Sequence, residues 1–207
     1  KQGHNVRILE SATSSQREGM AAGIGLSAQV QRFFEENDQL KDMPFGTPSN
    51  FMNIMDQHTE SKQKIPIGYA STSWDGIYYR LRANFDGYKS LYCPDPPQLQ
   101  TSGQAISFDT GIRATGVEED SEKLKVTAQD VNCGEARSYT ADYVVAADGA
   151  SSTVRRQLFP DLKRFEQDYM IWRGVVPTSE LHKELLDKIE SNTTIYPIPS
   201  ASAYMVL

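Results

Sequence analysis

An acidic residue stands at the end of a short apolar run near the start of the chain. Residues 6–9 (VRIL) are typical of a β-strand, and Glu10 closes it. A carboxylate at the carboxyl end of a strand has two acceptor oxygens, which match the two hydroxyl donors of a ribose. The alternative is an ordinary exposed acid at a strand end, which is the more frequent situation for an isolated Glu.

A turn of small residues is the second candidate. Ala22 and Gly23 lead through Ile24-Gly25 to a helix that Ser27 can cap. Such a turn lets a flat ring or a phosphate approach the backbone, although a loop that needs glycine only for its backbone angles fits equally well. Arg17, just upstream, carries the charge to contact a pyrophosphate, and its alternative is the commoner fate of a solvated surface charge.

The third candidate follows the most apolar run of the chain. Residues 143–147 (YVVAA) predict a strand buried on both faces, as in a parallel sheet, and Asp148-Gly149 comes directly after it. Ligands of open α/β sheets bind outside the carboxyl ends of the strands. There Gly149 would allow close approach, Asp148 could accept from a cofactor hydroxyl, and Arg155 could face the same pocket. A plain Asp-Gly turn between a strand and a helix is the alternative.

The elements that must position these residues alternate between strands and helices. Residues 1–5 predict the end of a helix, so the chain opens inside a βαβ unit whose first strand and Gly-rich loop would precede Lys1. Ser73 predicts the cap of a second helix with one buried apolar stripe, formed by Trp74, Ile77, Tyr78, Leu81 and Phe85. Further expected elements are strands at 51–56, 64–70, 170–176, 194–197 and 203–207, a β-meander over 106–140, and helices at 152–158 and 179–190.

Composition and charge exclude several classes of protein. The 207 residues, 39% hydrophobic and 23% charged, fit a folded globular protein. A net charge of −6 without a basic stripe argues against a nucleic-acid partner, and no apolar run approaches the roughly 20 residues that span a bilayer. Cys93 and Cys133 lack metal-ligand spacing, so we expect no metal, reduced thiols and a cytoplasmic location. Asp38 and Asp42 are interpreted as charges on a solvated helix end.

Taken together, these segments resemble one family of enzymes. The matching segments are residues 3–10, the Ala22-Gly23-Ile24 turn, Ser73-Trp74-Asp75 and the run from Ala141 to Arg155. They are similar to the single-component FAD-dependent aromatic-ring monooxygenases of the para-hydroxybenzoate hydroxylase fold. Residues 172–176 (WRGVV) and 196–199 (YPIP) look most like the 2,6-dihydroxypyridine 3-monooxygenase branch. Only the run 141–155 is specific by itself, and the other segments gain weight as a set.

The resemblance implies cofactors and a reaction. The cofactor-binding residues that it implies are Glu10, Arg17, Ala22, Gly23, Asp148, Gly149 and Arg155. Glu10 would bind the adenosine ribose of FAD, Arg17 and the Ala22-Gly23 turn would lie along the flavin and its pyrophosphate, and the Asp-Gly motif would serve both FAD and NAD(P)H. NAD(P)H would reduce FAD, O₂ would add to give a flavin hydroperoxide, and a small aromatic or heteroaromatic substrate would be hydroxylated. No catalytic base is assigned.

Two positions depart from the family pattern, and one of them is Ser11, where relatives often carry Arg. Many relatives carry an Arg that contacts FAD at the start of the helix that begins here with Trp74. Arg80 and Arg82 are the candidates to replace it, although their neighbour Leu81 is expected to face the core.

The resemblance also implies a mixed α/β (α+β) fold. Residues 1–165 would form an incomplete Rossmann-like FAD-binding domain with a β-meander, in which 44–72 contribute to the substrate side, and 166–207 would begin a β-rich substrate domain. The full-length parent would form a homodimer, and the chain alone would be inactive. Two alternatives remain: a non-catalytic, degenerate fragment of the flavoprotein fold, or another flavoenzyme of that fold, such as an epoxidase or a halogenase. Trp74 and Trp172 do not form the Trp-x-Trp-x-Ile pattern of halogenases.

Overall fold

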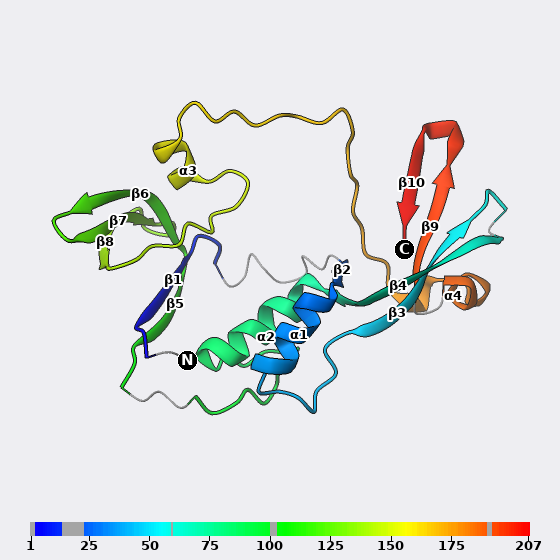
Figure 1. Ribbon diagram of the computed structural model, residues 1–207, viewed down its shortest axis with the longest axis horizontal. Helices are drawn as coiled ribbons and strands as arrows, with labels where there is room; N and C mark the ends of the chain where they lie inside the picture. Colours follow the sequence, from blue (N-terminus) through cyan, green and yellow to red (C-terminus); the bar gives the residue numbers. More distant parts are fainter. Residues whose placement is uncertain (1–2, 14–22, 59, 100–102, 190–191) are drawn as a thin grey trace. The chain divides into compact units, whose positions relative to one another are not determined.

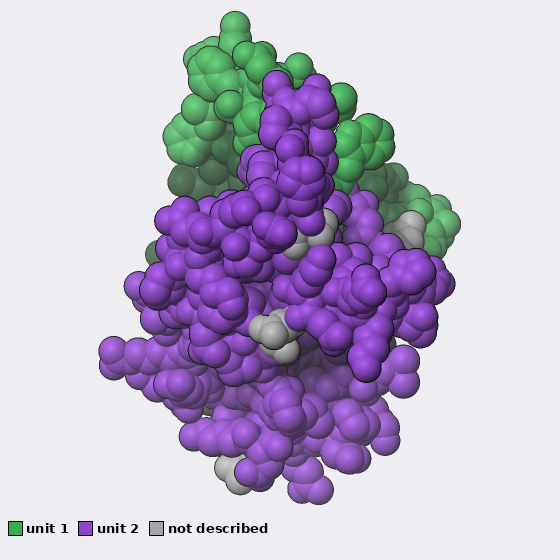
Figure 2. All heavy atoms as spheres, turned by 90° about the vertical axis from the view of Figure 1, so that its right-hand side faces the viewer, with its two compact units in different colours: residues 1–18, 100–172 green, residues 19–99, 173–207 purple. Residues whose placement is uncertain are grey.

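The computed structural model divides into two compact units, which Figure 2 shows in different colours. Unit 1 comprises residues 1–18 and 100–172, and unit 2 comprises residues 19–99 and 173–207. The structure describes residues 3–13, 23–58, 60–99, 103–189 and 192–207. Each unit therefore combines stretches that are far apart in the sequence. The division into an FAD-binding domain up to residue 165 and a substrate domain after it stays a prediction.

Unit 1 is built on two small sheets (Figure 1). Strand β1 (Val6–Glu10) runs parallel to β5 (Ile106–Thr110), as expected for part of a βαβ arrangement. Strands β6 (Ile112–Asp120), β7 (Lys123–Asp130) and β8 (Ala136–Ala141) form the antiparallel meander that the sequence predicts. The first run assigned to that meander, at 106, belongs instead to the parallel pair.

A short helix is hydrogen-bonded to the meander. Helix α3 (Thr153–Leu158) begins at Ser152, whose Oγ accepts a hydrogen bond from the N–H of Arg155 at 2.9 Å. The amide of Gln157 bonds both backbone groups of Val117 in β6, accepting from its N–H at 3.0 Å and donating to its carbonyl at 2.6 Å. Because the N–H and the carbonyl of Val117 are both bonded by one side chain, α3 is held at a defined place on β6.

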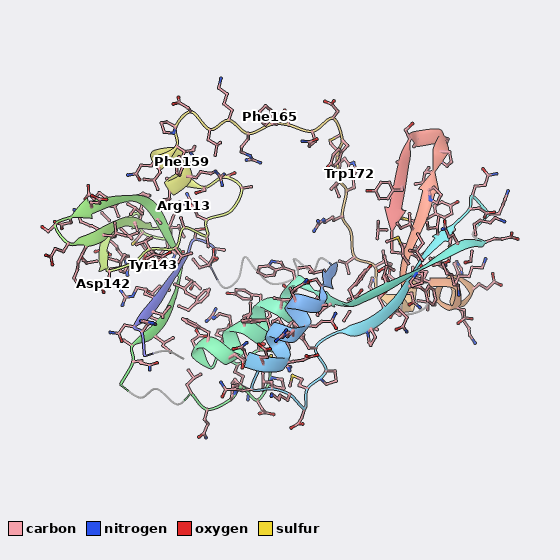
Figure 3. All side chains as sticks on the ribbon, in the orientation of Figure 1. Arg113, Asp142, Tyr143, Phe159, Phe165 and Trp172 are labelled. Carbon is pink, nitrogen blue, oxygen red and sulfur yellow. The ribbon has the colours of Figure 1, made fainter. Side chains whose placement is uncertain are left out.

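Two predicted strands, at 143–147 and 170–176, are not formed. Both stretches are irregular, and Figure 3 shows Tyr143 and Trp172 on chain without helix or strand. Tyr143 is 81% exposed and Trp172 is 88% exposed. A strand needs a neighbour for its backbone hydrogen bonds, and in the described part of unit 1 the parallel sheet consists of β1 and β5 alone. An apolar sequence without such a neighbour does not become a strand.

Unit 2 contains a five-stranded sheet in the order β10-β9-β3-β4-β2 (Figure 1). Its strands are β2 (Gly23–Leu26), β3 (Thr47–Met55), β4 (Ser61–Ser73), β9 (Thr193–Ile198) and β10 (Ala203–Val206). The hairpin β3–β4 joins β9 through a parallel pairing in which Met52 faces Thr193. The segment 44–72 thus shares its sheet with the last strands of the chain, which belong to the predicted substrate domain (166–207).

Among the residues that the structure describes, unit 2 also contains five helical segments. They are α1 (Ala28–Asn37), α2 (Trp74–Asp86), α4 (Lys183–Ile189) and the 3₁₀ turns η2 (Thr178–Glu180) and η3 (Pro199–Ala201). Ser27 and Ser73 cap α1 and α2 as predicted, and the Oγ of Ser73 accepts from the N–H of Gly76 at 2.9 Å. Gly87 ends α2 with φ of 69°, a left-handed conformation that glycine adopts without strain. No helix in the described ranges is long and apolar enough to cross a membrane.

The buried stripe of α2 differs from the predicted apolar one. Leu81 is 43% exposed, whereas Arg80 and Arg82 are 3% and 7% exposed. Arg80 forms an ion pair with Asp38, and Arg82 forms one with Asp86. Each buried positive charge is therefore neutralised by a carboxylate. Counting apolar residues at helical spacing cannot reveal a face that is buried through paired charges. Asp38 is likewise 7% exposed, so its interpretation as a solvated charge is wrong.

Candidate cofactor-binding site

Glu10 lies at the carboxyl end of β1, where the sequence places it. Its Oε1 accepts hydrogen bonds from the N–H of Ala12 at 2.7 Å and from the Oγ of Ser11 at 3.4 Å. These contacts hold the half-buried carboxylate against the turn that follows the strand. The side chain is thus oriented by its own turn at the edge of the sheet where ligands of parallel sheets bind.

Asp148 caps helix α3 across a short turn. Its Oδ2 accepts from the N–H of Thr153 at 2.7 Å and from the N–H of Val154 at 3.3 Å. Partial burial would raise the pKa of Asp148, but hydrogen bonds from Ser152 and from these two backbone groups outweigh it and hold the pKa below its usual value. The carboxylate is therefore charged at neutral pH and serves the turn itself, as the simpler interpretation of the Asp-Gly sequence predicts.

Gly149 and Arg155 complete this turn. Gly149 has φ of 75°, which disfavours other residues, and a Cβ atom at this position would meet no heavy atom within 4 Å. Arg155 donates from Nη1 to the carbonyl of Gly149 at 3.3 Å and from Nη2 to the carbonyl of Ala150. The structure thus brings Asp148, Gly149 and Arg155 together and leaves open space beside the glycine.

The small-residue turn is only partly described. Gly23 begins β2 and faces Ser73 of β4, and a Cβ atom on Gly23 would also meet nothing within 4 Å. Arg17 and Ala22 lie outside the described residues. Gly23 belongs to unit 2, whereas Glu10 and the Asp148 turn belong to unit 1, and each is described within its own unit.

The chemistry of these residues is compatible with the part in FAD binding that the resemblance predicts for them. A carboxylate stands at the end of a parallel strand, and the backbone of Gly149 is open to close approach by a cofactor. Glu10 would hold the ribose hydroxyls, while Asp148 and Arg155 would keep the Gly149 turn in shape. Arg80 and Arg82, considered above as flavin contacts, are instead buried in ion pairs with aspartates.

Sequence reasoning missed a second group of polar residues, in unit 2. Asp75 is 2% exposed; its Oδ2 accepts from the Oη of Tyr92 at 3.3 Å, and its Oδ1 has no hydrogen-bond partner among the described residues. A nearby pocket of about 200 Å³ is lined by Pro44, Phe45, Thr72, Ser73, Gly76, Arg80, Tyr92 and Cys93. Burial raises the pKa of the Cys93 thiol. The sequence signal was Asp75 in the first turn of a helix, where the helix dipole favours an acid whether or not it is buried.

Because Asp148 caps α3 as a charged carboxylate, its contribution to the stability of the fold depends on pH. Its pKa is lowered in the folded state, so the stabilisation is fully present above the unfolded pKa of about 3.9 and is lost as the pH falls through the folded value. Between about pH 5 and pH 3, we expect the melting temperature of the Asp148→Asn variant to fall less than that of the parent. Thermal melts by circular dichroism at several pH values test this, with Asp161→Asn, at an exposed position, as the control. Equal slopes for parent and Asp148→Asn would contradict the capping role.

Comparison with known proteins supports the same interpretation of the fold. Among solved structures, the chain is similar to the flavin-dependent monooxygenase PieE in complex with FAD and substrate, with 15% sequence identity and a TM-score of 0.56. The match covers 75% of this chain and 28% of that chain. The p-nitrophenol 4-monooxygenase PnpA from Pseudomonas putida DLL-E4 matches with 14% identity and a TM-score of 0.57, over 75% and 37%. CabE, an aromatic hydroxylase from angucycline biosynthesis, matches with 19% identity and a TM-score of 0.51, over 75% and 28%.

These matches confirm the predicted mixed α/β fold, and the chain spans between about a quarter and two fifths of the length of the three solved structures. No curated protein matches the chain. The sequence profile of the FAD binding domain matches residues 98–206, which is more than half of the chain. This stretch contains β5, the meander and the Asp148 turn. The chain therefore belongs to the FAD-binding domain family.

Proposed function

We propose that the chain is part of an FAD- and NAD(P)H-dependent monooxygenase that hydroxylates an aromatic or heteroaromatic ring. The observation that carries the proposal is the match of the FAD binding domain to residues 98–206, which contain the Asp148-Gly149 turn. The names of two similar structures, a p-nitrophenol monooxygenase and an aromatic hydroxylase, support a ring as substrate. The narrower assignment to 2,6-dihydroxypyridine 3-monooxygenases rests on residues 172–176 and 196–199 alone.

The residues of the chain would bind and orient, and FAD, when bound, supplies the redox chemistry with NAD(P)H and O₂. Glu10 accepts hydrogen bonds from the ribose hydroxyls, and its contact with the N–H of Ala12 keeps the carboxylate in place. Gly149 lets the cofactor come close to the backbone because it carries no side chain. Asp148 and Arg155 maintain the turn on both sides of Gly149. A cytoplasmic location, a homodimeric parent and the absence of a nucleic-acid partner belong to the same proposal.

One observation favours a second candidate function. The stretch 143–147, which would lead into the Asp148 turn as a strand, is unpaired, and Val145 is 74% exposed. A chain in this state fits a non-catalytic member of the flavoprotein fold that holds no flavin by itself. Titration of the purified chain with FAD separates the two candidates, because bound flavin shows shifted absorbance bands and quenched fluorescence.

The same titration tests the role of Glu10. If the chain binds FAD, we expect Glu10→Ala to weaken binding roughly 10- to 100-fold, because a hydrogen bond to a charged group is worth about 1.5–3 kcal/mol. Glu119→Ala, at an exposed position in β6, is the matched control and should bind like the parent. Unchanged affinity in the Glu10 variant would remove this residue from the proposed site. A folded parent that leaves the flavin spectrum unchanged would favour the second candidate.

A further inference from the structure

A connected row of four aromatic rings links the start of α2 to the segment that follows this helix. The rings of Trp74 and Tyr78 stack, with centroids 4.9 Å apart and an interplanar angle of 14°. Tyr78 meets Tyr79 edge-on at 5.0 Å, and Tyr79 stacks on Tyr92 at 5.4 Å and 9°. Each neighbouring pair lies at the separation of contacting rings, so these four residues form one aromatic path.

The aromatic path joins a half-buried end to an exposed end. Ser73, which directly precedes the half-buried Trp74, is the register partner of Gly23 in β2. Gly23 belongs to the turn that the resemblance places along the flavin. In the middle of the path Tyr79 is 9% exposed, whereas Tyr92 at its end is 44% exposed. The path therefore runs from beside the predicted cofactor turn, through the interior of unit 2, to solvent.

The hydroxyl groups of the path differ in their partners. The Oη of Tyr92 donates to the Oδ2 of Asp75 at 3.3 Å, and Asp75 is 2% exposed. Burial and the negative charge of Asp75 raise the pKa of Tyr92, so this phenol keeps its proton at neutral pH. The Oη of Tyr78 instead accepts from the Nη1 of Arg82 at 2.9 Å. A carboxylate can take up a phenol proton, whereas a guanidinium has no acceptor for it.

This difference decides where an oxidised ring is most stable. Loss of one electron makes a phenol strongly acidic, so a tyrosine is oxidised most easily where a base takes its proton in the same step. The hydrogen bond to Asp75 provides that base for Tyr92. An oxidising equivalent that enters the path at the indole of Trp74 therefore has a favourable end point at Tyr92.

We propose that the aromatic path carries oxidising equivalents from Trp74 to the surface at Tyr92. A one-electron oxidant of the oxygen-radical class removes an electron and the indole proton from Trp74. Trp74 regains the electron from Tyr92 through the two rings between them and takes a proton from water. Tyr92 becomes a neutral tyrosyl radical, and its proton moves to Asp75. The path stands on unit 2 alone; its use, the removal of oxidants formed when an enzyme activates O₂, rests on the proposed function.

Pulse radiolysis with azide radicals, which oxidise tryptophan in preference to protonated tyrosine, tests the path. It is carried out on the complete chain without flavin, in a Trp172→Phe background that leaves Trp74 as the one tryptophan of the two in the sequence. Trp172 is 88% exposed, so this substitution should leave the fold intact. We expect the absorbance of the tryptophan radical to decay at a rate independent of protein concentration, while that of the tyrosyl radical rises at the same rate.

Variants of the background protein locate the path. Tyr79→Phe and Tyr92→Phe keep the rings and remove the oxidisable phenols, so each should slow the transfer severalfold. Asp75→Asn should slow it as well, because an amide does not take up the phenol proton. Tyr204→Phe is the matched control, since Tyr204 lies in β10 and is 69% exposed, and it should leave the rate unchanged.

The outcomes separate this proposal from the proposed function, because no flavin is present. A transfer rate that rises with protein concentration, or one that is the same in Tyr92→Phe, overturns the proposal. If Asp75→Asn does not fold, the two tyrosine variants still decide. A chain that binds FAD but shows no transfer keeps the proposed function and loses the path. A chain that shows the transfer but does not bind FAD keeps the path and loses its proposed use.

Discussion

Replacing Arg80 with methionine is expected to lower the free energy of unfolding of unit 2 by about 3–5 kcal/mol. The Nε of Arg80 lies 2.5 Å from the Oδ2 of Asp38, and the two side chains are 4% and 5% exposed. Arg80 also donates to the carbonyls of Leu40 and Met43, which follow helix α1. Methionine removes the charge and these donors, and it leaves Asp38 as a buried anion with Asn84 as its remaining side-chain donor in the described structure.

Urea unfolding followed by near-ultraviolet circular dichroism measures this loss, because unit 2 contains the stacked rings of Trp74 and Tyr78. Arg32→Met is the matched control: its ion pair with Glu36 is on the surface, with Arg32 78% exposed, and its loss should cost less than about 0.5 kcal/mol. Adding Asp38→Leu to Arg80→Met should recover part of the stability, since an isolated buried charge costs more than an apolar pair. A single variant as stable as the parent would show that the ion pair does not hold α1 and α2 together.

Truncation of Leu26 to alanine is the second large effect, with an expected loss of about 2–5 kcal/mol. Leu26 ends β2 and is 2% exposed, which places it among the most deeply buried side chains described. Its Cδ1 lies 3.5 Å from the position that a Cβ on Gly46 would take, so the loop after α1 closes directly over it. Removal of the isobutyl group leaves a cavity that this tight contact cannot fill without moving the backbone.

The same urea titration tests the Leu26 variant. Leu91→Ala is its control, because the Leu91 side chain is fully exposed at 100% and its loss should change the free energy of unfolding by less than about 0.5 kcal/mol. Similar midpoints for the two leucine variants would mean that β2 is not part of the core of unit 2.

The features that could be predicted from the sequence are those decided by near neighbours. Ser27 and Ser73 cap their helices as expected, because a cap needs only the three residues that follow it. The strand before Glu10 and the meander were also predicted, since polar turns separate their apolar runs.

The features that were missed depend on partners far along the chain. The run 143–147 has a strand sequence, yet it lacks a neighbouring strand in the described structure. Arg80 is buried because Asp38, more than 40 positions earlier, neutralises it. Asp75 lies in an ordinary first turn by sequence, yet it is 2% exposed and accepts a hydrogen bond from Tyr92. Pairings of this kind leave no periodic trace in a single sequence.

The pairing of β1 with β5 has a consequence for the order of events during synthesis. Arg7 and Ser107, which touch across this pair, are 100 positions apart, and the intervening chain includes most of unit 2. At roughly 5–20 residues per second, β1 leaves the ribosome about 5–20 s before its partner exists. The apolar edge of β1 therefore stays unpaired while most of unit 2 is synthesised. During this interval the unpaired strand is exposed to aggregation and to chaperones.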